Sequence, residues 1–198
     1  MYIDLSDRGL TSVPNFNDQS VLESFGCSSA SEIEFLDLSC NEITKIEHLE
    51  SLVNLEDLIL RSNQITRIEG LESLVKLENL NFNENQITCI EGLDSLVNLI
   101  RLDIGFNKLT RIENLESLVK LEDLTLSGNQ ITRIVGLDSL VKLKSLDLGY
   151  NRITSIKNLS SLVKLKTLYV MGNPLDFGPS EVREDCLGRR FIKMKFFI

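Results

Sequence analysis

The sequence lacks the features of an exported, membrane-spanning or metal-binding chain. Its 198 residues include no tryptophan, 3 prolines, 1 histidine and 4 cysteines. The cysteines show neither metal-site spacing nor the paired clusters that cap secreted repeat proteins with disulfides. No apolar run reaches the roughly 18 residues that a membrane-spanning helix needs, and the opening stretch MYIDLSDRGL does not resemble a secretory signal. We therefore expect no metal, no cofactor and a location in the cytoplasm or the nucleus.

The chain also lacks an excess of positive charge. Its net charge is -8 and its calculated isoelectric point is about 4.8. Nucleic acids and anionic membranes both require a dense basic surface, so neither is expected as a partner. The composition favours another protein with a basic patch as the partner, bound by a monomer of this chain.

What the sequence does contain is a repeat of 22 residues. The stretch LDLSCNEITKI returns as LILRSNQITRI, LNFNENQITCI, LDIGFNKLTRI, LTLSGNQITRI and LDLGYNRITSI. A fixed period in the twenties is typical of a solenoid, in which each repeat forms one coil. One asparagine recurs at this spacing in every repeat: Asn41, Asn63, Asn85, Asn107, Asn129, Asn151 and Asn173.

Within one period the apolar spacing changes. Leu58 and Leu60 alternate with polar or variable residues as in a short strand, whereas the later apolar residues recur every three positions, as turns and 3₁₀-like segments allow. Each repeat therefore predicts a strand, a bend at the asparagine and an apolar return path. The asparagine side chain can bond backbone groups at the bend, in its own coil and in the next, so the seven amides should form an internal ladder.

A second column supports this register. Seven residues after each asparagine the chain has histidine, glycine or asparagine, the types that tolerate a positive φ angle. We predict a left-handed corner there, which explains the single histidine without catalysis or metal binding. The column consists of His48, Gly70, Gly92, Asn114, Gly136 and Asn158.

On these residues the chain resembles leucine-rich repeat proteins, specifically the 22-residue class typified by the regulatory subunit of protein phosphatase 1. The resemblance implies a curved right-handed α/β-type solenoid, with a parallel β-sheet on the concave face and short 3₁₀ or irregular segments on the convex face. It implies a single domain over residues 1–198. Residues 1–32 would be an N-terminal cap with a degenerate repeat and an insertion at 14–32, residues 33–173 seven repeats, and residues 174–198 a C-terminal cap.

The concave face is the predicted binding surface. Strand residues that point away from the core vary from coil to coil, whereas the core columns scarcely change, and exposed aromatic residues commonly anchor interfaces. The candidate contact residues are Phe35, Asp37, Ile59, Arg61, Asn81, Glu84, Arg101, Asp103, Phe106, Asp123, Asp147, Tyr150 and Tyr169. Phe106 and Tyr150 are expected above small neighbours, Tyr150 beside Gly149 and Gly128.

Catalysis is not expected from this face. Asp103 and Asp123 form the nearest predicted pair of carboxyl groups, but an open wall offers no cleft to raise the pKa of one of them. No phosphate-binding loop or activated nucleophile appears elsewhere. We interpret the chain as a non-enzymatic scaffold for a partner protein, with a phosphatase catalytic subunit as a candidate by resemblance. The alternative is an internalin-type surface adhesin that binds a cell-surface receptor. Such adhesins share the 22-residue period but usually carry a proline in the return segment that IEGLESL lacks.

Overall fold

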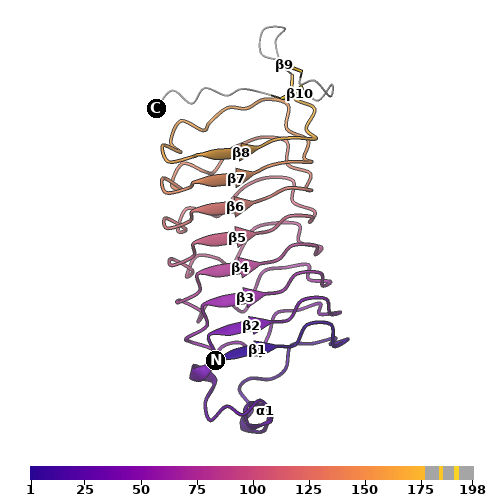
Figure 1. The fold of residues 1–198 in the computed structure, drawn as a ribbon, viewed down its shortest axis with the longest axis vertical. Helices are drawn as coiled ribbons and strands as arrows, with labels where there is room; N and C mark the ends of the chain where they lie inside the picture. Colours follow the sequence, from indigo (N-terminus) through magenta and orange to yellow (C-terminus); the bar gives the residue numbers. More distant parts are fainter. Residues whose placement is uncertain (177–182, 185–189, 192–198) are drawn as a thin grey trace.

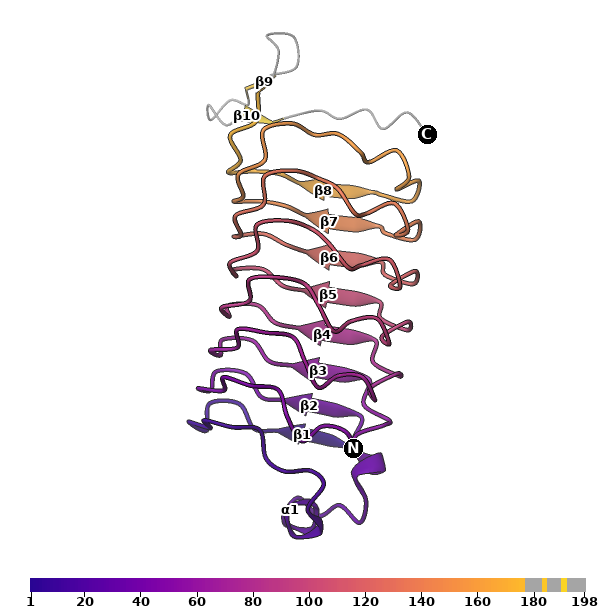
Figure 2. The same cartoon turned by 180° about the vertical axis from the view of Figure 1, so that it is seen from behind.

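The fold is an eight-stranded parallel sheet built from one short strand per coil (Figures 1 and 2). The computed structural model describes residues 1–176, 183–184 and 190–191. In these residues no helix is long and apolar enough to cross a membrane. The strands of the sheet are β1 (Tyr2–Asp4), β2 (Phe35–Asp37), β3 (Asp57–Ile59), β4 (Asn79–Asn81), β5 (Arg101–Asp103), β6 (Asp123–Thr125), β7 (Ser145–Asp147) and β8 (Thr167–Tyr169).

The strands pair in the register that the repeat predicts. Leu58 lies opposite Leu36 on one side and Leu80 on the other, each 22 residues away. Neighbouring strands follow each other in sequence order from β1 to β8. The chain therefore winds once per repeat, and the predicted leucine-rich solenoid fold is confirmed.

The core lies between the sheet and the return path of each coil. In the coil of β3, the side chains of Leu58, Leu60 and Ile65 are fully buried. The return path is irregular and turns by 3₁₀-type bonds, such as the one from the Leu55 N–H to the Leu52 carbonyl at 3.0 Å. Because each coil covers the leucines of its neighbours, stability comes from stacking rather than from any single coil.

The asparagine ladder is present as predicted. Asn107 is 7% exposed. Its Oδ1 accepts the Ile87 N–H at 2.9 Å. Its Nδ2 donates to the Phe82 carbonyl at 2.9 Å and to the Gly105 carbonyl at 2.9 Å. We expected each asparagine to bond the backbone of its own coil and of the following coil. Instead it bonds its own coil and the preceding coil. The first amide, Asn41, reaches back in the same way to the degenerate first repeat.

The predicted left-handed corners are confirmed in all six coils. His48 has a φ of 63° and Asn114 a φ of 56°. At Gly92 the approach of the backbone adds a second constraint, because a Cβ there would lie 2.7 Å from the Ile68 carbonyl oxygen. The column thus needs residues that tolerate positive φ, as its composition indicated.

The N-terminal insertion covers the first coil. Helix α1 (Gln19–Ser24) and the 3₁₀ helix η1 (Ala30–Glu32) lie in this segment. The Asp18 side chain accepts the Ser20 N–H and caps α1. Phe16 and Leu22 are buried in the same core as the coils, and Figure 1 shows α1 beyond β1 at that end of the stack. The segment that the sequence left without a predicted structure therefore closes the N-terminal end of the solenoid.

The C-terminal end is described only in part. Strands β9 (Arg183–Glu184) and β10 (Arg190–Phe191) pair antiparallel. The predicted C-terminal cap at 174–198 otherwise lies mostly outside the described residues, and the predicted domain boundaries stay predictions.

Candidate functional site on the concave face

The concave face is the side of the sheet β1 to β8 that faces solvent rather than the core. The strands carry two rows of side chains on this face. One row comes from the first residue of each strand and the other from the third, while the middle residue points into the core. In β3 to β6 the first row is Asp57, Asn79, Arg101 and Asp123, and the second row is Ile59, Asn81, Asp103 and Thr125.

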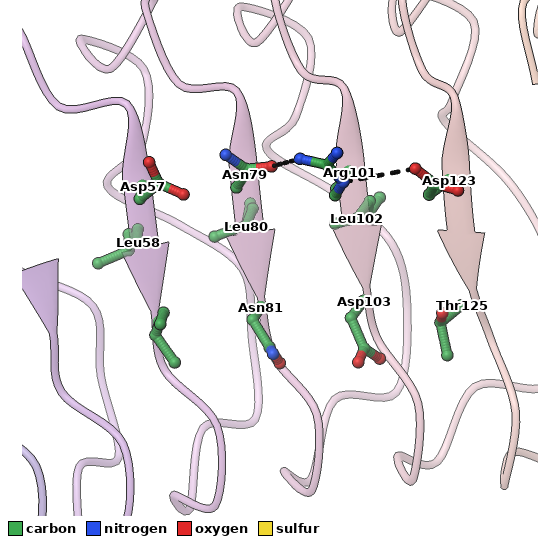
Figure 3. Close-up of a pocket in the computed structure, with 11 residues that line it drawn as sticks. Asp57, Leu58, Asn79, Leu80, Asn81, Arg101, Leu102, Asp103, Asp123 and Thr125 are labelled. Atoms are coloured by element: carbon green, nitrogen blue, oxygen red, sulfur yellow. Dashed lines mark hydrogen bonds and ion pairs between the residues drawn. The ribbon is translucent and has the colours of Figure 1, made fainter. Parts of the chain in front are cut away.

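These two rows border a shallow depression of about 320 Å³ at the middle of the sheet (Figure 3). Five of the predicted contact residues line it, namely Ile59, Asn81, Arg101, Asp103 and Asp123. Asp57, Asn79 and Thr125 complete its rim, although they were not among the predicted contact residues. The strand alternation could have found them, because they occupy the same two columns as the residues that were chosen.

Arg101 is the positive charge of the depression, and its neighbours hold it across three strands. Its Nη1 donates to Asn79 Oδ1 at 3.0 Å, and its Nε lies 3.4 Å from Asp123 Oδ2, as Figure 3 shows. With three aspartates around one arginine, the depression has an acidic surplus. An arginine or lysine of a partner would meet favourable charge there.

Asp103 has a structural contact as well as a place on this face. Its Oδ1 accepts the Gly105 N–H at 2.8 Å, and Asn83 Nδ2 donates to the same oxygen at 3.2 Å. Burial raises the pKa of the Asp103 carboxyl, against the lowering effect of these hydrogen bonds. The expectation that this wall could not raise a carboxyl pKa is therefore wrong for Asp103.

The same backbone contact recurs along the column. Asp37, Asn81 and Asp147 each accept the N–H of the residue two positions later at 2.8 Å. These predicted contact residues therefore also brace the end of their own strand. Sequence reasoning missed this role, although Asp and Asn two residues before a bend are a recognisable signal for it.

Asp103 and Asp123, the predicted nearer pair of carboxyl groups, lie on the neighbouring strands β5 and β6 but have different partners. The strand register places Asp123 opposite Arg101 and Asp103 opposite Thr125. Asp123 then pairs with Arg101, while Asp103 bonds to Asn83 and to the backbone. The two carboxyl groups therefore lie in different hydrogen-bonding environments.

Arg61 and Glu84 form an ion pair between neighbouring coils, at the carboxyl side of the strands. Arg61 Nη2 lies 3.0 Å from Glu84 Oε1, and the Ser62 hydroxyl donates to Glu84 Oε2 at 2.6 Å. The Ser62 hydrogen bond, followed by the Arg61 contact, lowers the pKa of Glu84. Both side chains stay largely exposed, so a partner can reach them.

The rings of Phe106 and Tyr150 project from the concave face, and each packs over a glycine of the following coil. Their side chains are 53% and 56% exposed. A Cβ at Gly128 would lie 2.7 Å from Phe106 Cδ1, and one at Gly172 would lie 2.6 Å from Tyr150 Cδ1. Phe106 thus has the small neighbour that we predicted. Tyr150 does not lean toward Gly128, because its ring covers Gly172 of the next coil.

The remaining predicted aromatics differ from each other. Tyr169 in β8 is 56% exposed, in keeping with an anchor. Phe35 in β2 is half-buried and stacks on Tyr2 of β1, with ring centroids 4.3 Å apart. Phe35 therefore covers the edge of the sheet at least as much as it faces a partner.

Phe106 and Tyr150 belong to a second left-handed column that the sequence did not reveal. Both have a φ of 52°, and Glu84 in the same column has a φ of 57°. Large residues rarely adopt this conformation, so the bend before each asparagine imposes it. The remaining members of the column are Asp7, Cys40, Ser62, Gly128 and Gly172.

No group of three or more His, Cys, Asp or Glu side chains could hold a metal ion within the described part of the chain. Histidine and cysteine contribute nothing to the depression. The chemistry of the concave face is that of ion pairs, amides and exposed rings.

Comparisons with known proteins agree with this description. The family model for leucine-rich repeats in two copies matches residues 31–73, 53–95, 97–139 and 141–180. No match was found among curated proteins.

Several solved structures from Listeria monocytogenes resemble the chain. An internalin, inlF, is 34% identical with a TM-score of 0.68, and the match covers 72% of this chain and 42% of that one. Internalin C2 is 26% identical with a TM-score of 0.76, covering 90% of this chain and 74% of the other. The functional domain of InlJ is 19% identical with a TM-score of 0.60, covering 91% and 46%, and it shows the fold alone. This chain thus spans less than half the length of the first and third of these structures.

The 22-residue coils, the buried amides and the family match over most of the sequence all lead to one assignment: the chain belongs to the leucine-rich repeat family.

Proposed function

We propose that the chain is a non-enzymatic scaffold that binds another protein on its concave face. The observation that carries this proposal is the concave face itself: an acidic depression at β3 to β6 with exposed aromatic rings beyond it. Leucine-rich repeat proteins generally act as protein-binding modules, which supports the same function.

The partner we propose carries a basic patch that includes an exposed arginine or lysine. That side chain would enter the depression, where Asp57, Asp103 and Asp123 outnumber Arg101. Apolar groups of the partner would contact Phe106 and Tyr150, whose rings pack over glycines of the following coil. Rigid aromatics at the centre of an interface commonly carry most of the binding energy.

The test is the affinity of a purified partner, identified by affinity capture and mass spectrometry and then measured by calorimetry. Phe106, Tyr150 and Tyr169 are changed together to alanine. We expect the affinity to fall by about 30-fold or more, because hot-spot side chains contribute about 2 kcal/mol or more.

A matched control changes three exposed threonines outside the strands β5, β6 and β7, in the same coils, to alanine: Thr110, Thr132 and Thr154. The control should bind like the wild type. Unchanged affinity in the aromatic variant, or an equal loss in the threonine variant, would refute docking on the concave face.

A phosphatase catalytic subunit is the narrower proposal for the partner, and it rests only on the resemblance to the phosphatase 1 regulatory class. It predicts a location in the cytoplasm or nucleus and retention of purified phosphatase catalytic subunit by the wild-type chain. Absence of that retention would remove this partner and leave the concave scaffold standing.

An internalin-type adhesin is the second candidate, favoured by the 34% identity to inlF over 72% of the chain. It predicts that the protein is accessible at the cell surface and that the captured partner is a surface receptor. Labelling of intact cells with a membrane-impermeant reagent separates the two candidates, because only an adhesin would be labelled.

A further inference from the structure

Each coil enters its strand through a turn whose tip carries an exposed valine. In the coil before β3, the Leu55 N–H bonds to the Leu52 carbonyl, which leaves Val53 and Asn54 at the tip. Six such valines, between 44% and 65% exposed, lie in consecutive coils and form what we call the valine ridge. They are Val53, Val75, Val97, Val119, Val141 and Val163. Single exposed valines are ordinary, but a continuous row of them is an apolar surface without a cover.

A column of lysine and asparagine runs beside the valine ridge. In the first four coils the two types alternate, and each lysine bonds to the asparagine before it: Lys76 to Asn54 at 2.8 Å and Lys120 to Asn98 at 2.7 Å. The alternation then stops. Lys142 and Lys164 follow Lys120 in consecutive coils, and within the described residues neither makes a hydrogen bond or ion pair.

A second column, immediately before the strands, changes sign along the solenoid. It begins with glutamates in the N-terminal coils and ends with lysines in the C-terminal coils. Its members are Glu34, Glu56, Glu78, Ile100, Glu122, Lys144 and Lys166. Like charges in adjacent coils lie about 5 Å apart and repel each other. Only Glu122 and Lys144 neutralise each other inside this column.

The whole chain has the same polarity. Residues 1–57 contain 12 acidic and 2 basic residues, whereas residues 124–167 contain 2 acidic and 7 basic residues. One end of the solenoid is therefore strongly acidic and the other basic, although the net charge is negative.

We propose that two copies of this chain associate along this edge in antiparallel orientation, valine ridge against valine ridge. The sign-changing column has seven members with Ile100 at its centre. A two-fold axis at Ile100 therefore places Lys166 opposite Glu34 of the second copy and Lys144 opposite Glu56. Because a two-fold interface is self-complementary, each of these pairs forms twice. The dimer replaces the monomer that the sequence analysis predicts.

Spacing favours a second copy over other acidic partners. The glutamates of the N-terminal coils and the lysines of the C-terminal coils are columns of one solenoid, so their charges repeat at the same interval. Any other partner would have to match that interval independently. Glu34 also contacts the N-terminal amine at 3.0 Å but keeps 64% of its side chain exposed.

Two contacts oppose the arrangement and limit its strength. In the column beside the valine ridge, the same two-fold axis places Lys76 opposite Lys120 of the second copy. Glu78 lies opposite Glu122, so the charge of Lys144 must serve Glu122 of its own chain and Glu56 of the second copy. The three N–H donors of a lysine ammonium allow both contacts. A narrow ridge also buries less surface than a standard interface. We therefore expect a dimer that dissociates on dilution and at high salt.

The experiment is sedimentation velocity of the full chain from about 10 µM to about 1 mM, a range suited to a weak interface. The wild type should shift from monomer to dimer within that range, and about 1 M salt should reverse the shift. A wild type that stays monomeric throughout would overturn the proposal.

Charge reversal tests the register. The variant Lys144→Glu with Lys166→Glu should be monomeric, as should the variant Glu34→Lys with Glu56→Lys, because each creates like charges at every pair. An equimolar mixture of the two variants should dimerise again, because the pairs of positions 34 with 166 and 56 with 144 then join opposite charges, as in the wild type. A mixture that stays monomeric would contradict the antiparallel register.

The control variant is Lys45→Glu with Arg133→Glu, which changes the net charge by the same amount as the variant Lys144→Glu with Lys166→Glu, at exposed positions away from this edge. It should dimerise like the wild type. Circular dichroism should show that all variants keep the fold. Loss of the dimer in this control would attribute the effect to net charge and refute the proposed edge.

Discussion

Two adjacent columns of the repeat behave in opposite ways. Asparagine occupies one in all seven coils, and its side chain is buried in the first six, as at Asn107 with 7% exposure. The residue just before it changes through cysteine, serine, glutamate, phenylalanine, glycine and tyrosine, and Phe106 is 53% exposed. The difference shows that unpaired backbone groups of two coils determine the first residue. The second needs only to tolerate a left-handed turn and is free to vary for binding.

The largest expected effect comes from breaking the constant column. Asn107→Ala leaves the buried Ile87 N–H without a partner and removes one of the two donors to each of the Phe82 and Gly105 carbonyls, which keep the Asn85 amide and the Glu84 N–H. Since one buried unpaired group costs about 1–3 kcal/mol and two weakened carbonyl contacts add to it, we expect a loss of about 2–4 kcal/mol in unfolding free energy. Urea denaturation measures it.

Two variants calibrate that result. Phe106→Ala, one residue away, should cost less than about 1 kcal/mol because the ring is largely exposed. Asn173→Ala should cost less than Asn107→Ala, since Asn173 lies in the last coil and is only half-buried. Equal losses at Asn107 and Phe106 would remove the distinction between the two columns.

An intermediate effect is expected at Gly128, where the variable column meets Phe106. Gly128→Ala forces alanine into a φ of 66° and places its Cβ 2.7 Å from Phe106 Cδ1. We expect a loss of about 1–2 kcal/mol, part from the backbone and part from the ring.

A double-mutant cycle separates the two parts. In the Phe106→Ala background the steric part should disappear and the loss at Gly128 should shrink. The same background should leave the cost of Gly92→Ala unchanged, because there the obstacle is the Ile68 carbonyl. If Phe106→Ala brings no relief at Gly128, the ring does not lie over that glycine.

The smallest expected effect is at Asp103, which combines the two roles compared above. It faces the depression, and it also accepts a backbone N–H at the end of its strand. Burial raises the pKa of its carboxyl, so the stability that Asp103 contributes is complete below the ordinary carboxyl pKa and is lost as the pH rises through the raised value. Asp103→Asn keeps an oxygen that accepts the Gly105 N–H and carries no charge. We expect the variant to gain stability relative to wild type, by under about 1 kcal/mol, between about pH 3 and pH 7.

Urea denaturation across that range measures this difference. The stability that Glu84 contributes changes with pH in the opposite direction, because the pKa of Glu84 is lowered. Its contribution is present above the ordinary carboxyl pKa and is lost as the pH falls through the lowered value. A stability difference for Asp103→Asn that is constant with pH would show that its carboxyl has no raised pKa.

Most of the frame could be predicted from the sequence because it repeats. The asparagines from Asn41 to Asn173 are needed to bond backbone groups. His48 and Gly70 are types that tolerate the positive φ angle of the corners. The left-handed column through Phe106 could not be predicted, since phenylalanine carries no signal for a positive φ angle.

The concave face could be predicted as columns but not as contacts. The column positions of Arg101 and Asp123 followed from the repeat, yet the strand register makes them partners and separates Asp123 from Asp103. The direction of the Tyr150 ring depends on the coil that follows it, and a column alone does not give that direction. The closing of the N-terminal end by Phe16 and Leu22 had no repeat to reveal it.

Hydroxyl-radical footprinting of the chain, alone and bound to its captured partner, tests the docking surface most directly. Our account predicts that the partner protects Phe106, Tyr150 and Tyr169, which are all more than half exposed in the free chain. Val75 and Val97 on the turn tips should react equally in both states. Protection of the turn tips with unchanged reactivity of the three rings would contradict binding on the concave face.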